Sequence, residues 1–289
     1  MPTVTRFAPS PTGHLHLGHA YSALFAERAA AADGGRFLLR IEDIDGTRCR
    51  PEFEAAITED LAWLGLAWKE PVRRQSEHLE EYRRALDRLA EDDLIYPCFC
   101  TRGEIREEIE SSGAAPHHIN EGPDGPLYPG TCRDMDIEER GAHLQSGAPF
   151  ALRIHMQRAR ARAEALTGAL LWRDRDAGEV VATPEIFGDA VLARKDTPTS
   201  YHLSVVVDDH LQGINLVTRG EDLRAASHLH RLLQALLGFD TPEYRFHHLL
   251  TGADGRRFAK RDKSATIKGL REAGHTPAEV VAMTGIESL

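Results

Sequence analysis

The sequence has no apolar run close to the roughly 20 residues that a membrane-spanning helix needs. Its first ten residues contain no basic segment followed by an apolar one, so we expect a cytoplasmic protein with no membrane partner. Acidic residues outnumber basic ones by 45 to 35, giving a formal net charge of −10. A wholly basic nucleic-acid-binding surface is excluded, because phosphate neutralisation requires clustered Lys and Arg. Any RNA contact should therefore be local.

Two common phosphate-binding motifs are absent as well. Neither G-x-G-x-x-G nor G-x-x-x-x-G-K-[ST] occurs, so phosphates are not handled in either of those ways. Cysteine is scarce, with only Cys49, Cys98, Cys100 and Cys132. Cys98 and Cys100 are too close for an easy disulfide, so metal ligation is the better interpretation of that pair. Cys49 has no partner pattern and is interpreted as a bystander thiol.

The hydrophobic pattern predicts an α/β protein. A strand over 3–8, a helix over 18–32 and a strand over 36–41 indicate a βαβ unit with a parallel sheet. Amphipathic helices are expected over about 52–64 and 77–92. The pattern resumes at 186–194, with a helix over 201–208, a strand over 214–218 and a helix over 222–237.

The region between these two parts has a different character. Gly and Pro concentrate between Ser111 and Pro129, and short strand-like pieces follow over 150–155, 170–173 and 179–182. We therefore expect a Rossmann-like parallel sheet split by an inserted module with antiparallel pieces. The expected divisions are 1–95 for the first half of the nucleotide-binding domain, 96–185 for the insertion, 186–238 for the second half, and 239–289 for a basic loop and short helices.

A Pro-rich turn follows the first expected strand and leads into two histidines. The run is Pro9-Ser10-Pro11-Thr12-Gly13, then His16-Leu17-Gly18-His19 where the helix should begin. The glycine lets a nucleotide approach the backbone closely, and the helix N-terminus and the imidazole donors can stabilise negative charge on a phosphate. A bare His-x-Gly-His also arises by chance, whereas the whole run from Pro9 to His19 is far more specific.

This run resembles the HIGH signature of class I aminoacyl-tRNA synthetases, in the form found in glutamyl enzymes. Further elements of that family occur in the same order and cover essentially the whole chain: Arg40–Asp45, Tyr201–Leu203, Val207–His210, Arg219–Leu223 and a late basic loop. The resemblance implies that His16, His19 and Lys260 are catalytic, and that Gly18 joins them in binding ATP, with Mg²⁺ on the phosphates.

The late basic loop departs from the family pattern. Glutamyl enzymes usually carry Lys-Leu-Ser-Lys-Arg there, whereas this sequence has Arg257-Phe258-Ala259-Lys260-Arg261. Lys260 is kept and can place its charge beside the developing pyrophosphate. The replaced lysine and the lost hydroxyl bear on loop dynamics and activation rate. A solvated basic loop is the alternative interpretation.

Charge favours glutamate as the amino-acid substrate. Arg6 and Arg219, both at expected strand ends on one edge of the sheet, can hold its two carboxylates with forked hydrogen bonds. Glutamine would leave a buried guanidinium unpaired, at a cost of roughly 3–5 kcal/mol. Which arginine holds which carboxylate stays open, and either one alone could form an ordinary ion pair. By resemblance, the glutamate-binding positions are Arg6, Phe7, Ala8, Pro9, Ser10, Glu42, Tyr201 and Arg219.

The cysteines form a second candidate site. Cys98-x-Cys100 and the later Cys132 supply three thiolates, which suit Zn²⁺ with its four tetrahedral ligands. The Cys-x-Cys…Tyr-x-x-x-Cys pattern resembles the zinc module of glutamyl-queuosine tRNA(Asp) synthetases, which implies Tyr128 as the fourth ligand of one structural Zn²⁺. His117 and His118 are more conventional alternatives, and unliganded buried cysteines are the simplest. A deaminase-like zinc site is excluded, because the Pro-Cys-x-Cys spacing is one residue short and no upstream His-x-Glu occurs.

The resemblance also extends to the overall organisation. Only 28 residues follow Arg261, so we expect no anticodon-reading domain. A monomer is expected independently of this. This organisation resembles the glutamyl-queuosine enzymes, which activate glutamate with ATP without tRNA and transfer it to queuosine in tRNA(Asp). The alternatives are a minimal glutamyl-tRNA synthetase charging a 3′ end, a non-catalytic tRNA- or amino-acid-binding paralog, and a small nucleotidylyltransferase.

Overall fold

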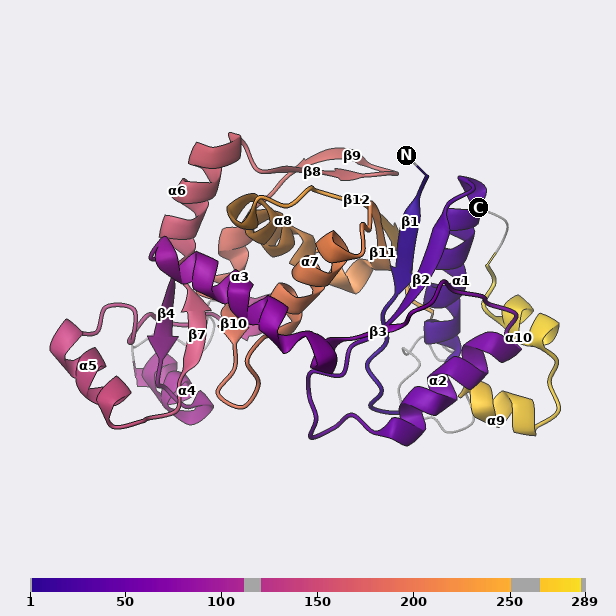
Figure 1. The fold of residues 1–289 in the computed structure, drawn as a ribbon, viewed down its shortest axis with the longest axis horizontal. Coiled ribbons are helices and arrows are strands. Elements are labelled where there is room, and N and C mark those ends of the chain that lie inside the picture. The colour runs from indigo at the N-terminus through magenta and orange to yellow at the C-terminus, as the bar shows by residue number, and fades with distance from the viewer. Residues whose placement is uncertain (1, 112–120, 251–265, 287–289) are drawn as a thin grey trace.

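The computed structural model describes residues 2–111, 121–250 and 266–286 (Figure 1). Its N-terminal unit confirms the expected βαβ arrangement. Strand β1 (Val4–Phe7) pairs in parallel with β2 (Arg36–Ile41), and the two are connected by helix α1 (Leu17–Ala32). A short strand, β3 (Arg73–Arg74), extends this sheet beyond β2. Parallel strands place their carboxyl ends on one edge, which is where open α/β sheets bind ligands.

A second group of strands continues the sheet on the other side of β1. Strand β11 (Leu216–Gly220) pairs in parallel with β12 (Glu243–His247), and Figure 1 shows β11 beside β1. Asn215 joins the two groups, because its backbone N donates to the Val4 carbonyl at 3.2 Å and its side-chain oxygen accepts from the Val4 N–H at 2.7 Å. The parallel sheet of an α/β fold is thus confirmed.

The far edge of the sheet differs from the expected organisation. Strand β8 (Leu171–Asp174) pairs in parallel with β12 and in antiparallel with β9 (Gly178–Val181). This hairpin falls within the range expected for the insertion, yet it hydrogen-bonds to the nucleotide-binding sheet. Strand β12 was not expected at all. Its partners β8 and β11 are distant in sequence, so local periodicity gives it little support.

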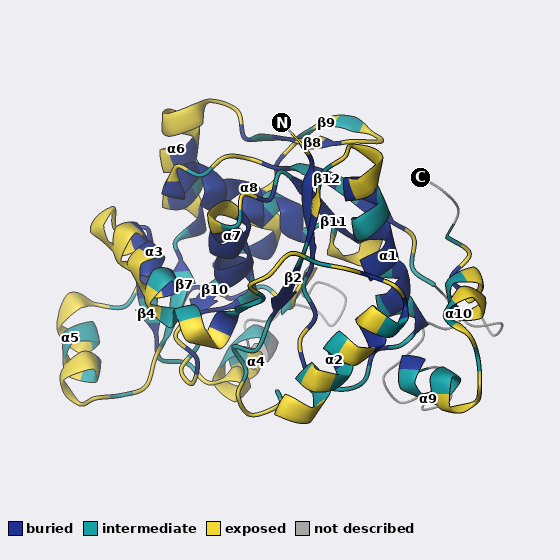
Figure 2. Ribbon diagram, turned by 45° about the vertical axis from the view of Figure 1, so that its right-hand side comes forward, coloured by how far each residue is buried: buried dark blue, intermediate teal, exposed yellow. Residues whose placement is uncertain are grey.

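Helices α7 (Tyr201–Leu211) and α8 (Ala226–Leu237) form the interior beside the sheet, and Figure 2 shows both largely buried. Helix α8 starts later than expected, because a 3₁₀ turn (Glu221–Leu223) precedes it. The remaining helices of this part are α2 (Pro51–Trp63), α3 (Leu79–Glu91), α6 (Met156–Thr167), α9 (Ile267–Glu272) and α10 (Pro277–Met283), with 3₁₀ turns at Gln75–His78 and Pro184–Phe187.

A separate antiparallel sheet lies at the opposite end of the molecule from α9 and α10 (Figure 1). It runs in the order β10 (Val191–Ala193), β7 (Ala151–Ile154), β4 (Ile95–Cys98). Its other elements are helices α4 (Arg102–Ser111) and α5 (Ile137–Gln145) and the hairpin of β5 (Glu121–Gly122) and β6 (Gly125–Pro126). Within the described ranges no helix combines the length and apolar character needed to cross a membrane.

Candidate active site and candidate metal centre

The two histidines of the N-terminal motif lie together at the start of α1. His16 is the N-cap, and its Nδ1 accepts from the Gly18 N–H at 3.1 Å, while His19 Nδ1 accepts from the His16 N–H at 3.2 Å. The imidazole rings stack with their centroids 3.7 Å apart. Both rings therefore lie beside the positive end of the helix dipole, an arrangement suited to an anion.

The C-terminal helical segment packs directly against this motif. Ile267 N donates to the Leu15 carbonyl at 2.8 Å, and Thr266 forms an isolated β-bridge with His16. Thr266 is the first described residue after the gap at 251–265. The expected ATP-binding and catalytic residue Lys260, and the variant positions Arg257 and Ala259, lie outside the described residues.

Arg6 is held in a buried ion network at the end of β1. Its Nε donates to Asp209 Oδ1 at 2.9 Å and its Nη2 to Oδ2 at 3.3 Å, while Nη1 donates to the Thr218 carbonyl at 3.2 Å. Arg40 Nη1 donates to the same Asp209 oxygen at 2.8 Å. Burial alone would raise the pKa of Asp209, but Arg6 and Arg40 together hold it below its ordinary value.

A second carboxylate, Asp208, stabilises this ion network through further hydrogen bonds. It accepts from Arg73 Nε at 2.7 Å, from Gln75 Nε2 at 2.7 Å and from the Tyr82 hydroxyl at 2.9 Å. Arg40 Nε lies 3.6 Å from it. Because adjacent aspartates on α7 bind arginines from β1, β2 and β3, the helix is locked to the strand ends that carry the candidate site.

Three of the expected glutamate-binding residues line one small pocket. Ser10, Glu42 and Tyr201 surround a space of about 140 Å³, and Arg194 and Gln75 also line it. Burial raises the pKa of Glu42, with Arg40 and Arg6 opposing the shift. The structure therefore brings these distant positions together, with a carboxylate facing the same space as a phenol and a hydroxyl.

Arg219 differs from Arg6 in having no carboxylate partner among the described residues. It is 5% exposed, and its Nε and Nη2 groups have no hydrogen-bond partner in the described structure. Its Nη1 donates to His230 Nδ1 at 3.3 Å. Burial raises the pKa of the nearby Tyr201 hydroxyl, while the positive charges of Arg219 and Arg6 act in the opposite direction. Both guanidinium groups thus lie near Tyr201, and Arg219 keeps two nitrogens without a hydrogen-bond partner in the described structure.

The other expected glutamate-binding residues support the site through the backbone. Phe7 is buried in the core between α1 and β2, opposite Leu39. Ala8 is half-buried and Pro9 buried, and the Pro9 carbonyl accepts from the Glu42 N–H at 3.0 Å. This bond ties the Pro-rich turn to the end of β2, so the turn brings Ser10 next to Glu42.

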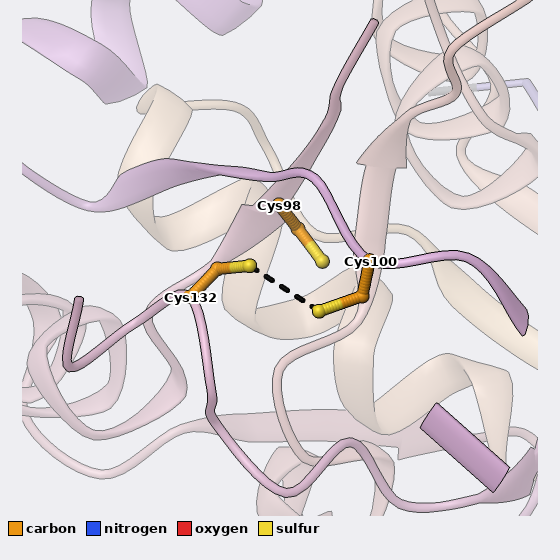
Figure 3. Close-up of side chains that lie close together, drawn as sticks. All are labelled: Cys98, Cys100 and Cys132. Carbon is orange, nitrogen blue, oxygen red and sulfur yellow. Dashed lines mark hydrogen bonds between the residues drawn. The ribbon is translucent and has the colours of Figure 1, made fainter. Parts of the chain in front are cut away.

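The three expected metal-ligating cysteines converge at the end of β4 (Figure 3). The Sγ atoms of Cys98, Cys100 and Cys132 all lie within 4.8 Å of one another, and Cys100 and Cys132 approach to 3.3 Å. Sulfur ligands of tetrahedral Zn²⁺, each about 2.3 Å from the ion, are separated by similar distances. The donor set fits a soft divalent metal.

Tyr128 lies at the same cluster. Its hydroxyl is 3.5 Å from Cys100 Sγ and accepts from the Cys132 N–H at 2.8 Å. Burial raises the pKa of the Cys100 thiol to about 11. The alternative ligands His117 and His118 lie outside the described residues, so Tyr128 is the oxygen donor that the described structure offers as a fourth ligand.

Several residues of the site received no role from the sequence. Asp208 and Asp209 directly follow the apolar run Val205–Val207 within α7, and Arg40 interrupts the apolar strand β2. Charges inside otherwise apolar elements were the available signal, because such residues are rarely buried unless paired. His230 and Arg194 carried no comparable signal.

Comparison with known proteins agrees with this geometry. A family model described as tRNA synthetases class I (E and Q), catalytic domain, matches residues 2–286. The chain belongs to this family of ligases, whose members use ATP with Mg²⁺.

Relatives narrow the resemblance further. The chain is 46% identical over 288 residues to a glutamyl-Q tRNA(Asp) synthetase from Rhodobacter capsulatus, covering 98% of this chain and 100% of that one. It is 40% identical to a protein of the same name from Symbiobacterium thermophilum, covering 96% and 83%. A crystal structure of a glutamate tRNA ligase from Elizabethkingia meningosepticum in complex with its amino acid matches with a TM-score of 0.80 at 29% identity. That match covers 99% of this chain and 61% of the other.

Proposed function

We propose that this chain activates L-glutamate with ATP in the absence of tRNA and transfers it to the queuosine base of tRNA(Asp). A glutamate carboxylate oxygen attacks the α-phosphorus of ATP and pyrophosphate leaves, giving glutamyl-adenylate. The activated acyl group then passes to the queuosine base and AMP leaves. The names of the full-length relatives support this choice of acceptor.

The Arg219 guanidinium, which lacks a carboxylate partner among the described residues, is the observation that carries the choice of amino acid. A buried arginine with two N–H-bearing nitrogens lacking partners is costly unless a ligand supplies acceptors. A carboxylate accepts two parallel bonds from such a fork. Glu42 faces the same pocket as Tyr201, so its carboxylate can receive the ammonium group of the amino acid.

The chain's remaining residues supply positioning and charge stabilisation. Arg6 keeps N–H groups beyond those bound to Asp209 and Thr218, so it can assist Arg219. His16 and His19 stabilise charge on the phosphates, close to the backbone of Gly18. Lys260 has the same role by resemblance. Holding the carboxylate and the α-phosphorus in line supplies much of the acceleration.

Glutamate-dependent ATP–pyrophosphate exchange without tRNA tests the first step. We expect exchange with glutamate and little with glutamine. Arg219→Lys keeps the charge but loses the fork, so the KM for glutamate should rise about tenfold or more. A wild-type chain that exchanges equally with glutamine, or not at all, would contradict the proposal.

The acceptor is tested with radiolabelled glutamate and four forms of tRNA(Asp). These carry or lack queuosine, and carry or lack the 3′-terminal adenosine. Labelling that requires queuosine and survives removal of the 3′ adenosine supports the proposed acceptor. Labelling that requires the 3′ adenosine instead identifies a minimal glutamyl-tRNA synthetase.

We further propose one structural Zn²⁺ bound by Cys98, Cys100, Cys132 and Tyr128. The convergence of the three thiols and the phenol supports this ligand set. A bound Zn²⁺ would fix the end of β4 to the loop that carries Cys132, because its ligands come from both segments.

A further inference from the structure

A chain of hydrogen bonds runs from Arg219 to the inserted module. Arg219 Nη1 lies 3.3 Å from His230 Nδ1 on α8, and His230 Nε2 lies 3.2 Å from His202 Nδ1 on α7. His202 Nε2 then lies 2.8 Å from Asp124 Oδ2. These hydrogen bonds join α8, α7 and the turn between β5 and β6 to the guanidinium that the proposed function assigns to the substrate carboxylate.

The chemistry of arginine fixes the direction of every bond in this chain. A guanidinium donates and never accepts, so His230 Nδ1 must be the acceptor. A neutral imidazole with Nδ1 unprotonated carries its hydrogen on Nε2, which therefore donates to His202 Nδ1. By the same reasoning His202 donates from Nε2 to the Asp124 carboxylate. Each group in this series of hydrogen bonds therefore has one defined donor or acceptor role.

The surroundings of the two rings agree with this assignment. His230 is 1% exposed, and burial together with the charge of Arg219 lowers its pKa well below the ordinary value. His202 is also buried, with its ring packed against those of Phe187 and Tyr201. The rings have little freedom to rotate, so the position of one ring constrains the next.

Asp124 is the solvent-exposed end of this series of hydrogen bonds. It occupies the turn between β5 and β6, its side chain is 64% exposed, and it lines a pocket of about 710 Å³ together with His202 and Tyr201. The hydrogen bond from His202 lowers the pKa of Asp124, so its carboxylate is charged at neutral pH. The series of hydrogen bonds therefore ends in a negative carboxylate on the inserted module and in a positive guanidinium at the candidate glutamate site.

We propose that His230 and His202 are positioning residues that orient Arg219 for the substrate carboxylate, and that Asp124 of the inserted module anchors them. This inference rests on the proposed function, in which Arg219 holds glutamate. With Nη1 tied to His230, the unpaired Nε and Nη2 groups keep a fixed direction instead of exchanging among rotamers.

Substitutions of His230 can show whether its hydrogen bonds orient Arg219 or whether its ring only fills space in the core. Glutamine can accept from Arg219 through its oxygen and donate to His202 through its nitrogen, whereas leucine can do neither. In ATP–pyrophosphate exchange, we expect His230→Leu to raise the KM for glutamate about tenfold or more, with a smaller change in kcat and an unchanged KM for ATP. His230→Gln should stay within about threefold of the wild type.

If His230→Leu fails to fold, two further variants test the positioning role. His202→Phe keeps a ring of similar size but no ring nitrogen, and should raise the KM for glutamate in the same selective way. Asp124→Ala should raise it by a smaller factor than His202→Phe. Its control, Glu121→Ala, removes an exposed carboxylate from the same hairpin and should leave the KM unchanged.

The outcomes keep this inference distinct from the proposed function. A wild-type chain without glutamate-dependent exchange would overturn both. A wild type with such exchange, combined with a glutamate KM that is unchanged in His202→Phe and Asp124→Ala, would overturn only the positioning role. Equal losses in His230→Leu and His230→Gln would overturn it too, because the hydrogen-bonding pattern would then not matter.

Discussion

Arg6 from the first strand and Asp209 from α7 form a two-bond ion pair, with Nε–Oδ1 and Nη2–Oδ2 separations of 2.9 and 3.3 Å. The partners are 203 residues apart in sequence and both are buried. Because Arg40 shares the same carboxylate, one aspartate offsets charge from two guanidinium groups. The pair fixes the position of Arg6, while Arg219 has no carboxylate partner among the described residues.

Replacing Asp209 with asparagine should strongly destabilise the fold. The variant leaves Arg6 and Arg40 buried beside a neutral amide, and breaking a buried ion pair costs about 3–5 kcal/mol. Asp134→Asn is the matched control, since the Arg133–Asp134 pair is largely exposed on the Asp134 side and should contribute little to stability. Urea denaturation at pH 7 measures both. Similar losses in the two variants would contradict the assigned role of Asp209.

Replacing Gly18 with alanine should lower activity more than stability. A Cβ there would meet His16 Cε1 at 3.0 Å and Nδ1 at 3.1 Å, so the stacked histidine pair must shift. We expect exchange activity to fall about tenfold or more through the misplaced imidazoles, because small displacements at a reacting centre are costly.

Gly141→Ala provides the control for Gly18→Ala. Gly141 lies in α5, and a Cβ there has no neighbour within 4 Å. This variant should keep full activity and gain up to about 1 kcal/mol of stability, because alanine favours helix. Thermal unfolding and exchange kinetics distinguish the two. Full activity in Gly18→Ala would show that the histidine geometry tolerates displacement.

Metal analysis tests the proposed zinc centre. We expect about one Zn²⁺ per chain, most of it lost in Cys100→Ser, because one of four tetrahedral ligands is weakened. Cys49→Ser should keep its zinc, since Cys49 lies outside the cluster. Elemental analysis after dialysis reports the content. A wild-type chain without zinc, or equal loss from both variants, would refute the ligand set.

The sequence predicted the elements that local periodicity defines. The expected βαβ unit is present, as are helices at α2, α3, α7 and α8, because each has its own apolar pattern. Strand β12 and the pairing of β8 with it were missed, since both depend on partners far away in the chain. Contacts of that kind leave little trace in a short window of sequence.

In the candidate site, too, some features could be predicted from the sequence and others depend on contacts between distant residues. Ser10, Glu42 and Tyr201 were expected to act together, and they line one pocket. The different states of the two arginines could not be foreseen, because the pairing of Arg6 depends on where α7 places Asp209. The His230–His202 link was equally out of reach, since it follows from the packing of α7 against α8.

Asp60 is a buried carboxylate of α2. It is 0% exposed, its oxygens have no hydrogen-bond partner among the described residues, and Arg271 of α9 lies 3.6 Å away. Burial raises the pKa of Asp60 to about 6. The folded chain therefore binds this proton more tightly than the unfolded chain, whose aspartate pKa is about 3.9.

Stability from protonated Asp60 should thus be complete below pH 4 and disappear as pH rises through 6. The two pKa values correspond to about 3 kcal/mol at most. Asp60→Asn cannot ionise, so its free energy of unfolding relative to the wild type should increase between pH 4 and pH 7. Glu59→Gln removes the exposed acidic partner of Arg271 and should show a smaller change between the two pH values, because the Glu59 charge contributes only part of the raised pKa of Asp60. Denaturant titrations at both pH values measure these differences, and a constant offset for Asp60→Asn would show that Asp60 has an ordinary pKa.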